Sequence, residues 1–186
     1  MKFLAISGSG RRASTNTAML RALSSAAQPD HQVTVYDGIG DLQIFCPDFE
    51  AKPLPRSVQD FADLIGQSDG LIIASPEYVR AIPGGLKNAI DWFVSRKEIV
   101  HKPVVLMHAS QRGDDMLAQL RIVLSTVSSR FNEDIFLRYG LMKMSPDEIE
   151  AYFETGRPRA ELARFICRLA AHCSYSEPEA DVFLSA

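Results

Sequence analysis

Hydrophobic residues follow two alternating patterns along the chain. Short, nearly continuous apolar runs occur at 2–7, 32–37, 70–75, 102–110 and 134–137. Between these runs, apolar residues recur every three or four positions, as at Val58, Phe61, Ala62 and Ile65. The first pattern predicts strands and the second predicts amphipathic helices. Because the two alternate, we expect an α/β fold with a doubly wound, five-stranded parallel sheet and helices on both faces.

Two stretches, 71–74 and 104–107, are apolar throughout, which is typical of central strands buried on both faces of a sheet. The last helical stripe ends at Cys173, so we expect residues 174–186 to form a loosely held tail. We find no repeat, linker or low-complexity segment in the sequence. Residues 1–186 are therefore expected to form a single domain.

Local signals mark two further segments. The stretch 38–55 contains several glycines and prolines and is the longest irregular segment that we expect. Ser145, Pro146, Asp147 and Glu148 form the sequence pattern of a capping box, which predicts the start of a short helix.

Composition narrows the class of protein. The chain has 186 residues, of which 46% are apolar and 23% charged, with 20 Lys and Arg against 23 Asp and Glu. This balance excludes disordered and collagen-like chains, and it argues against a nucleic-acid partner, which needs clustered basic residues. No apolar stretch approaches the roughly 20 residues that span a bilayer, and no signal peptide is recognisable. We therefore expect a cytoplasmic protein with no membrane partner.

Cysteines and histidines show no metal-binding spacing. The three cysteines form no CxxC pair, and the four histidines are scattered. We expect free thiols and no metal site.

The loop after the first predicted strand has the features of an anion site. Residues 8–16 combine small residues with Arg11, Ser14 and Asn16, directly before a predicted helix. A helix N-terminus offers free N–H groups and the positive end of its dipole, and Arg11 adds a full charge. The simpler alternative is that Ser14 only caps the helix, Asn16 is an ordinary first-turn residue and the arginines are solvated.

The identity of the anion is a separate question. GSGRRA at 8–13 also fits the GxGxxA variant of the dinucleotide fingerprint, and Asp37 ends the next strand where a ribose-binding acid is expected. However, the polar crowding of this loop suits a terminal monophosphate better than a bridging pyrophosphate. The sequence therefore favours a mononucleotide.

A second loop follows the third predicted strand. Pro76 and Pro83 frame it, and it is expected to face the first loop across one crevice at the carboxyl ends of the strands. Tyr78 can then lie beside a flat aromatic ligand. Alternatively, the prolines only shape a turn and Tyr78 covers the core.

Together, the motifs GSGRRASTN (8–16) and SPEYVRAIPGGLKNAIDWF (75–93) resemble the NADPH-dependent FMN reductase family, which includes quinone, azo-dye and chromate reductases on a flavodoxin-like fold. The resemblance extends from residue 2 to about residue 130. It implies an FMN phosphate held by Ser9, Arg11, Ser14, Thr15 and Asn16. It also implies an isoalloxazine ring lined, largely through backbone groups, by Pro76, Glu77, Tyr78 and Val79.

This chain departs from the family pattern at two places. Val79 and Arg80 follow Pro-Glu-Tyr, where the family usually has Asn, and the loop 108–115 contains a single glycine where the family is glycine-rich. Arg80 can meet a 2′-phosphate or an acidic acceptor, although a loop arginine is more often solvated or paired at the surface. His108 can donate to a flavin or a substrate, although a histidine at a strand end is more often satisfied by its neighbours.

The resemblance implies an NAD(P)H-dependent, FMN-containing oxidoreductase. Hydride would pass from the nicotinamide co-substrate through FMN to a small, flat acceptor such as a quinone, and no catalytic side chain is expected. Two alternatives stay open: a flavodoxin-like electron-transfer protein without nicotinamide activity, and a Rossmann-type NAD(P)-binding dehydrogenase.

The resemblance also implies a homodimer or homotetramer. Leu86, Ile90 and Phe93 form an apolar stripe at helical spacing, which leaves Trp92 on another side of that helix. We expect a second subunit to bury Trp92, the alternative being that Trp92 reaches the core of its own chain.

Overall fold

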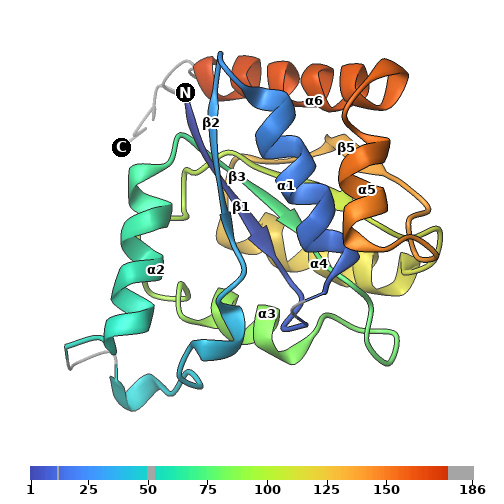
Figure 1. Ribbon diagram of the computed structural model, residues 1–186. Helices are drawn as coiled ribbons and strands as arrows, with labels where there is room; N and C mark the ends of the chain where they lie inside the picture. Colours follow the sequence, from blue (N-terminus) through green and yellow to red (C-terminus); the bar gives the residue numbers. More distant parts are fainter. Residues whose placement is uncertain (12, 50–52, 176–186) are drawn as a thin grey trace.

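The structure is a computed structural model that describes residues 1–11, 13–49 and 53–175. Five parallel strands form one sheet, in the order β2-β1-β3-β4-β5 (Figure 1). Their bounds are Lys2–Ser7 (β1), Gln32–Tyr36 (β2), Gly70–Ala74 (β3), Val104–His108 (β4) and Phe131–Arg138 (β5). The predicted five-stranded parallel sheet is confirmed.

The strand order decides between the two nucleotide-binding folds that the sequence suggested. A Rossmann sheet has the order 3-2-1-4-5-6, whereas the order found here is flavodoxin-like. β2 lies on one side of β1 and β3 on the other, so successive connections run in opposite directions from β1. In doubly wound sheets, ligands bind at this point of reversal, outside the carboxyl ends of the strands.

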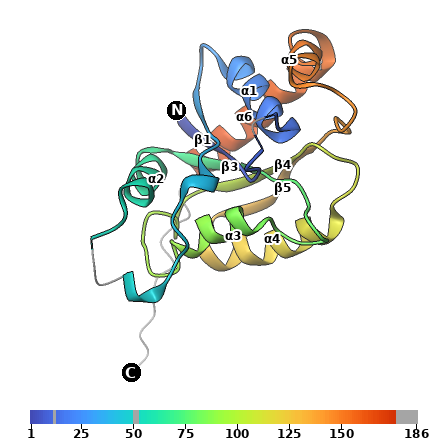
Figure 2. The ribbon, with the colours of Figure 1, turned by 60° about the horizontal axis from the view of Figure 1, so that its bottom comes forward.

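Helices cover both faces of the sheet, as expected (Figures 1 and 2). One face carries α1 (Thr15–Ala27), α5 (Pro146–Tyr152) and α6 (Gly156–Ser174). The other face carries α2 (Arg56–Gln67), α3 (Gly84–Asp91) and α4 (Asp114–Val127). Two short 3-10 helices, at Ile39–Asp41 and Pro47–Phe49, lie in the segment expected to be irregular.

The period-two alternation of strand side chains builds a separate core on each face. In β1, Phe3 and Ala5 pack with α1 and α6, while Leu4 and Ile6 pack with α2 and α3. Every residue of β3 and of β4 is buried, which confirms the prediction that the apolar runs 71–74 and 104–107 are central strands.

Several boundaries differ from the predicted ones. β4 is shorter than the predicted 102–110, and β5 starts three residues before the predicted 134–137. The apolar pattern missed the start of β5 because residues 131–133 of this edge strand are half-buried or exposed and show no buried alternation. α6 includes Ser174, the first residue of the expected tail, and residues 176–186 lie outside the described part of the chain.

The predicted capping box at the start of α5 is confirmed. Ser145 Oγ accepts a hydrogen bond from Glu148 N at 3.3 Å, and Glu148 Oε2 accepts one from Ser145 N at 2.7 Å. Pro146, which lacks an N–H, occupies the first helical position, where no backbone donor is needed.

The expectation that a second subunit buries Trp92 is wrong. Trp92 is only 2% exposed within its own chain. Its ring packs edge-on against Phe45, with the centroids 5.3 Å apart, and its Nε1–H donates to Gln43 O at 2.7 Å. The irregular segment before α2 supplies the partners of Trp92 and buries it, together with Leu86, Ile90 and Phe93, in one core cluster of the chain.

Candidate functional site

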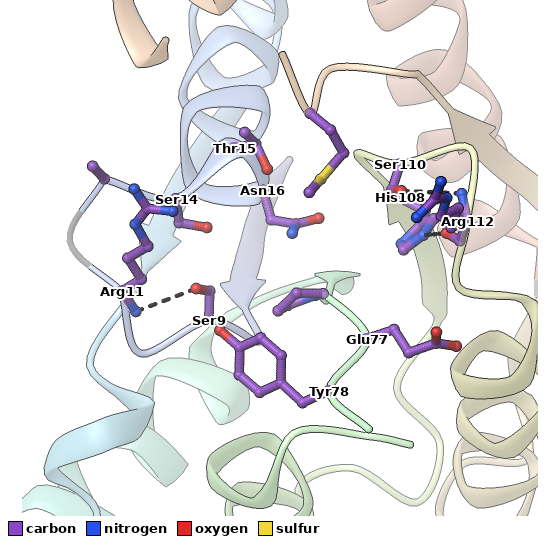
Figure 3. Close-up of a pocket in the computed structure, with 13 residues that line it drawn as sticks. Ser9, Arg11, Ser14, Thr15, Asn16, Glu77, Tyr78, His108, Ser110 and Arg112 are labelled. Atoms are coloured by element: carbon purple, nitrogen blue, oxygen red, sulfur yellow. Dashed lines mark hydrogen bonds between the residues drawn. The ribbon is translucent and has the colours of Figure 1, made fainter. Parts of the chain in front are cut away.

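A cavity of about 310 Å³ opens at the carboxyl ends of the central strands, a size typical of small-ligand sites. The loops after β1, β3 and β4, the first turn of α1, the last residue of β4 and one residue after β5 line it (Figure 3). The lining residues are Ser9, Arg11, Ala13, Ser14, Thr15, Asn16, Pro76, Glu77, Tyr78, His108, Ser110, Arg112 and Met142. Eight of the nine residues expected at the site are therefore brought together, and Val79 is the exception.

The first loop leads directly into the N-terminus of α1. Ser14 is the N-cap: its Oγ accepts a hydrogen bond from Thr17 N at 3.3 Å. The hydroxyl of Ser14 keeps its own hydrogen for another acceptor, so capping and ligand binding are compatible. Ser9 Oγ accepts a hydrogen bond from Arg11 N at 3.2 Å, which fixes the backbone, while the Arg11 guanidinium has no ion-pair partner among the described residues.

Asn16, in the first turn of α1, has an unusual environment. It is 4% exposed and lines the cavity, yet its Oδ1 has no hydrogen-bond partner among the described residues. A buried polar atom without a partner costs free energy, and Asn16 lies where a ligand would remove that cost. Oδ1 can accept from a ligand hydroxyl, and the opposite amide orientation presents the NH₂ group to a phosphate oxygen.

Two glycines of the first loop have different roles. A Cβ on Gly8 would lie 2.6 Å from Ser75 Oγ, so Gly8 allows the first and second loops to approach closely. Apart from the chain neighbours, no atom of the described residues lies within 4 Å of the Cβ position of Gly10, which leaves room beside the exposed loop backbone. A ligand can therefore approach the backbone at Gly10.

The second loop makes a tight two-residue turn at its tip. Tyr78 N donates to Ala81 O at 3.2 Å and Ala81 N donates to Tyr78 O at 3.0 Å, with Val79 and Arg80 between them at φ of 51° and 59°. Positive φ at both central residues is the geometry of a type I′ hairpin turn. Val79 is 98% exposed at this tip and does not line the cavity, whereas Tyr78 does.

Side chains of the second loop tie it to the start of α4. Glu77 Oε2 accepts a hydrogen bond from Met116 N at 3.1 Å, so Glu77 caps a helix whose own N-cap, Gly113, has no side chain. Arg80 Nε lies 2.5 Å from Asp115 Oδ2, and this hydrogen bond raises the pKa of the Arg80 guanidinium. Arg80 is therefore paired at the surface, which was the alternative to its binding a 2′-phosphate or an acidic acceptor.

His108 also has a positioning role. It is 1% exposed, with Nδ1 2.9 Å from Ser75 O and Nε2 2.5 Å from Arg112 O. Both ring nitrogens therefore face carbonyl oxygens of the protein, and His108 links the loops after β3 and β4. Neighbours satisfy this histidine, which was the commoner of the two alternatives.

The sequence did not point to four lining residues: Ala13, Ser110, Arg112 and Met142. Ser110 and Arg112 lie in the glycine-poor loop after β4, whose departure from the family pattern was the available signal. Met142 follows β5, and nothing in its local sequence marks it. It reaches the cavity because Leu141 N donates to Ala109 O at 3.2 Å, which holds this loop beside the end of β4.

A second, shallower hollow of about 640 Å³ lies near the amino ends of β1 and β2, beside residues such as Lys2, His31 and Asp69. Ligand sites in parallel sheets lie at the opposite end, so the smaller cavity is the better candidate. Within the described ranges, no three His, Cys, Asp or Glu residues gather as a metal-ligand group. No helix in that part of the chain is both long and apolar enough to cross a membrane.

Comparison with known proteins decides the family. The sequence profile of the NADPH-dependent FMN reductase family matches residues 1–134. The chain belongs to this family. The resemblance predicted from the two loop motifs is thus confirmed, and both motifs lie within the matched residues.

Several named proteins are similar to this member of the FMN reductase family. A quinone reductase of Escherichia coli strain K12 is 33% identical over 113 residues, which is 59% of this chain and 60% of that protein. The NADH:(hydroxy)cinnamate reductase subunit CrdA of Vibrio ruber is 38% identical over 113 residues, 59% of this chain and 54% of that subunit. The aligned regions thus cover less than two thirds of either relative.

A solved structure supports the fold over a greater length. FerB, a flavoenzyme NAD(P)H:(acceptor) oxidoreductase from Paracoccus denitrificans, superposes with a TM-score of 0.67 at 24% identity. The superposition covers 92% of this chain and 98% of FerB. At this identity the likeness concerns the flavodoxin-like fold, which extends beyond the residues that the family profile matches.

Proposed function

We propose that this protein is an NAD(P)H-dependent oxidoreductase that holds FMN in the cavity and reduces a flat, quinone-like acceptor. The observation that carries the proposal is the first loop at the N-terminus of α1. There Arg11 has no carboxylate partner among the described residues, and the buried Oδ1 of Asn16 lacks a hydrogen-bond partner. Family membership and the flavodoxin-like strand order both favour FMN as the ligand at this position.

The residues present fit FMN. Arg11 and the free N–H groups at the start of α1 would hold the phosphate, with Ser9, Ser14, Thr15 and Asn16 adding hydroxyl and amide groups. Pro76, Glu77 and Tyr78 would border the ring system on the side of the second loop. Val79 would contribute its backbone at most, because its side chain points into solvent.

The protein's part in the reaction is to bind, orient and shield. FMN, when bound, supplies the redox chemistry by accepting a hydride at its ring and passing electrons to a second molecule. Glu77 caps α4 and both ring nitrogens of His108 face carbonyl oxygens, so these groups hold the loops in place. Tyr78 and Met142 offer apolar surface at the rim, suited to a flat aromatic ring.

The names of relatives suggest the class of acceptor. They include quinone reductases and a 2-hydroxy-1,4-benzoquinone reductase from a Burkholderia species that is 39% identical over 92 residues. We therefore propose a quinone or a similar conjugated ring as the acceptor of this chain.

Equilibrium dialysis of the purified protein against FMN and FAD tests the proposal. FMN should be retained more tightly than FAD, because the crowded loop suits a terminal phosphate. The visible band of the bound flavin should then bleach under NADPH or NADH without oxygen and return when a quinone is added. Retention of neither flavin would contradict the proposal, and FMN that neither nucleotide reduces would favour a flavodoxin-like electron carrier.

We also propose that the protein is a cytoplasmic homodimer or homotetramer. Three unpaired thiols favour a reducing compartment. The oligomeric state rests on the family resemblance alone, because Trp92 is already buried within one chain. Analytical ultracentrifugation of the flavin-loaded protein measures it directly, and a monomer would contradict this part of the proposal.

A further inference from the structure

The cavity carries two separate arginines. Arg11 comes from the loop after β1 and Arg112 from the loop after β4, and β3 lies between these two strands in the sheet. Figure 3 shows the two side chains on opposite sides of the cavity, with Asn16 and Tyr78 between them. The two arginines therefore offer separate positive charges from opposite sides of the cavity.

The other charged side chains near Arg112 are committed to protein partners. Glu77 caps α4, Asp115 pairs with Arg80, and Asp114 Oδ1 lies 2.6 Å from Arg138 Nη1. Among the described residues, no carboxylate lies within ion-pair distance of Arg112, although Asp114 and Asp115 nearly adjoin it in sequence. The positive charge of Arg112 is thus left facing the cavity.

The backbone of Arg112 is held firmly, while its side chain has no ion-pair partner among the described residues. Arg112 N donates to Ser110 Oγ at 3.0 Å, and His108 Nε2 lies 2.5 Å from Arg112 O. Most exposed arginines project from a surface into water, but this one projects from a fixed loop that lines a pocket. A cation on a fixed backbone loses less freedom when it binds an anion than one on a mobile loop does.

We propose that Arg112 is a specificity residue that recognises an anionic oxygen group on the second substrate of the pocket. The inference rests on the proposed function. Oxidised FMN carries one anionic group, its phosphate, which Arg11 and the N-terminus of α1 would hold. The remaining cation then matches a carboxylate, sulfonate or phosphate on the molecule that exchanges electrons with the flavin. That molecule is either an acidic quinone-like acceptor or the phosphorylated nicotinamide donor.

The test compares Arg112→Gln, Arg112→Lys and the wild type as FMN-loaded enzymes. Flavin retention is measured first, by dialysis and visible absorbance, so that a failure of the proposed function is seen before any rate is interpreted. One arm measures kcat/KM for 1,4-naphthoquinone and its 2-sulfonate with a fixed donor. The other arm uses NADPH, NADH and the uncharged dihydronicotinamide riboside with neutral naphthoquinone as the fixed acceptor. Arg164→Gln, a variant of an exposed arginine on α6 away from the cavity, is the matched control.

Arg112→Gln should lower kcat/KM for the anionic member of one arm about tenfold, and Arg112→Lys should restore part of it, because the effect is that of one partly screened charge-assisted contact. The uncharged member should change less than about twofold, and raised salt should erase the difference. A selective loss of kcat/KM for the sulfonate identifies an acidic acceptor as the partner of Arg112. A selective loss of kcat/KM for the nucleotides identifies the phosphates of the donor.

Two results would overturn the proposal. One is an equal fall in kcat/KM for the charged and uncharged members of both arms, or no fall in kcat/KM for any of them. The other is weakened FMN retention with every rate reduced in proportion, because Arg112 would then belong to the cofactor site.

Discussion

The first loop and the two loops opposite it hold their polar side chains in different ways. In the loop 8–16, neither the Arg11 guanidinium nor the buried Oδ1 of Asn16 has a partner in the described part of the chain. In the loops 76–82 and 108–116, which we term the linked loops, Glu77, Arg80 and His108 all bind protein groups. Side chains tied within the protein shape the cavity, whereas untied ones are available to a ligand.

This contrast separates residues that look alike in the sequence. Arg11, Arg80 and Arg112 are all loop arginines close to the cavity, yet only Arg80 has a carboxylate partner among the described residues. Substitutions of the tied side chains in the linked loops should therefore change the stability of the protein without ligand. Substitutions of the two untied arginines, Arg11 and Arg112, should change ligand affinity.

The largest effect is expected at Gly113, within the linked loops. It adopts φ of 108°, and a Cβ would lie 2.7 Å from His108 Nε2. Gly113→Ala should destabilise the flavin-free protein by about 3 kcal/mol, from backbone strain and crowding together. Urea denaturation measures this value. Gly84→Ala is the control, because no atom of the described residues beyond its own surroundings in the helix lies within 4 Å of its Cβ position, and equal losses in the two variants would contradict this prediction.

Next in size is the effect of Arg11→Ala on the first loop. FMN affinity should fall by about 1.5 to 3 kcal/mol, the range for a charge-assisted hydrogen bond, while the melting temperature without flavin stays nearly unchanged. Equilibrium dialysis measures the FMN affinity, and thermal melting measures the stability of the flavin-free protein. Arg12→Ala, at a position outside the described residues, should weaken binding less. Equal losses from both substitutions would show that Arg11 is not the phosphate ligand.

A smaller effect is expected from Glu77. Glu77→Ala removes the acceptor at the N-terminus of α4 and should cost about 1 kcal/mol of stability, the usual value of a helix cap. Glu77→Gln keeps an acceptor oxygen and should lose only a few tenths of that value. Thermal or urea unfolding measures the stability of both variants. If the negative charge of Glu77 mattered instead of capping, both variants would lose the same amount of stability.

The smallest expected effect is a gain at Val79. A β-branched residue at φ of 51° is strained, and the family usually has Asn at this position, a residue that tolerates this conformation. Val79→Asn should stabilise the flavin-free protein by about 0.5 to 1 kcal/mol. Val94→Asn replaces another exposed valine and should have almost no effect. A loss of stability in Val79→Asn would show that the valine makes a favourable contact.

Local sequence predicted the elements whose signals are continuous along the chain. The apolar runs predicted all five strands. Residues 8–16 predicted the first loop of the site because their functional groups adjoin one another directly before a helix. The start of β5 was not predicted because residues 131–133 of this edge strand are half-buried or exposed and carry no buried pattern.

What could not be predicted depends on segments far apart in the sequence. Met142 reaches the cavity through a loop held against Ala109, and His108 is satisfied by the carbonyl of Ser75. The partners of Trp92 lie more than forty positions earlier, as its bond to Gln43 shows. Helical spacing gives the direction of a side chain but not the segment that will cover it.

Trp92 also supplies a natural spectroscopic probe. It is the one tryptophan of the chain, and its indole is held between α3 and the irregular segment through Phe45 and the carbonyl of Gln43. Its fluorescence therefore reports the environment of this junction rather than an average over the molecule. A red shift in emission that precedes the loss of circular dichroism would signal release of the segment 42–49 while the sheet is still folded. The protein thus carries an intrinsic optical marker of one local opening event, with no label added.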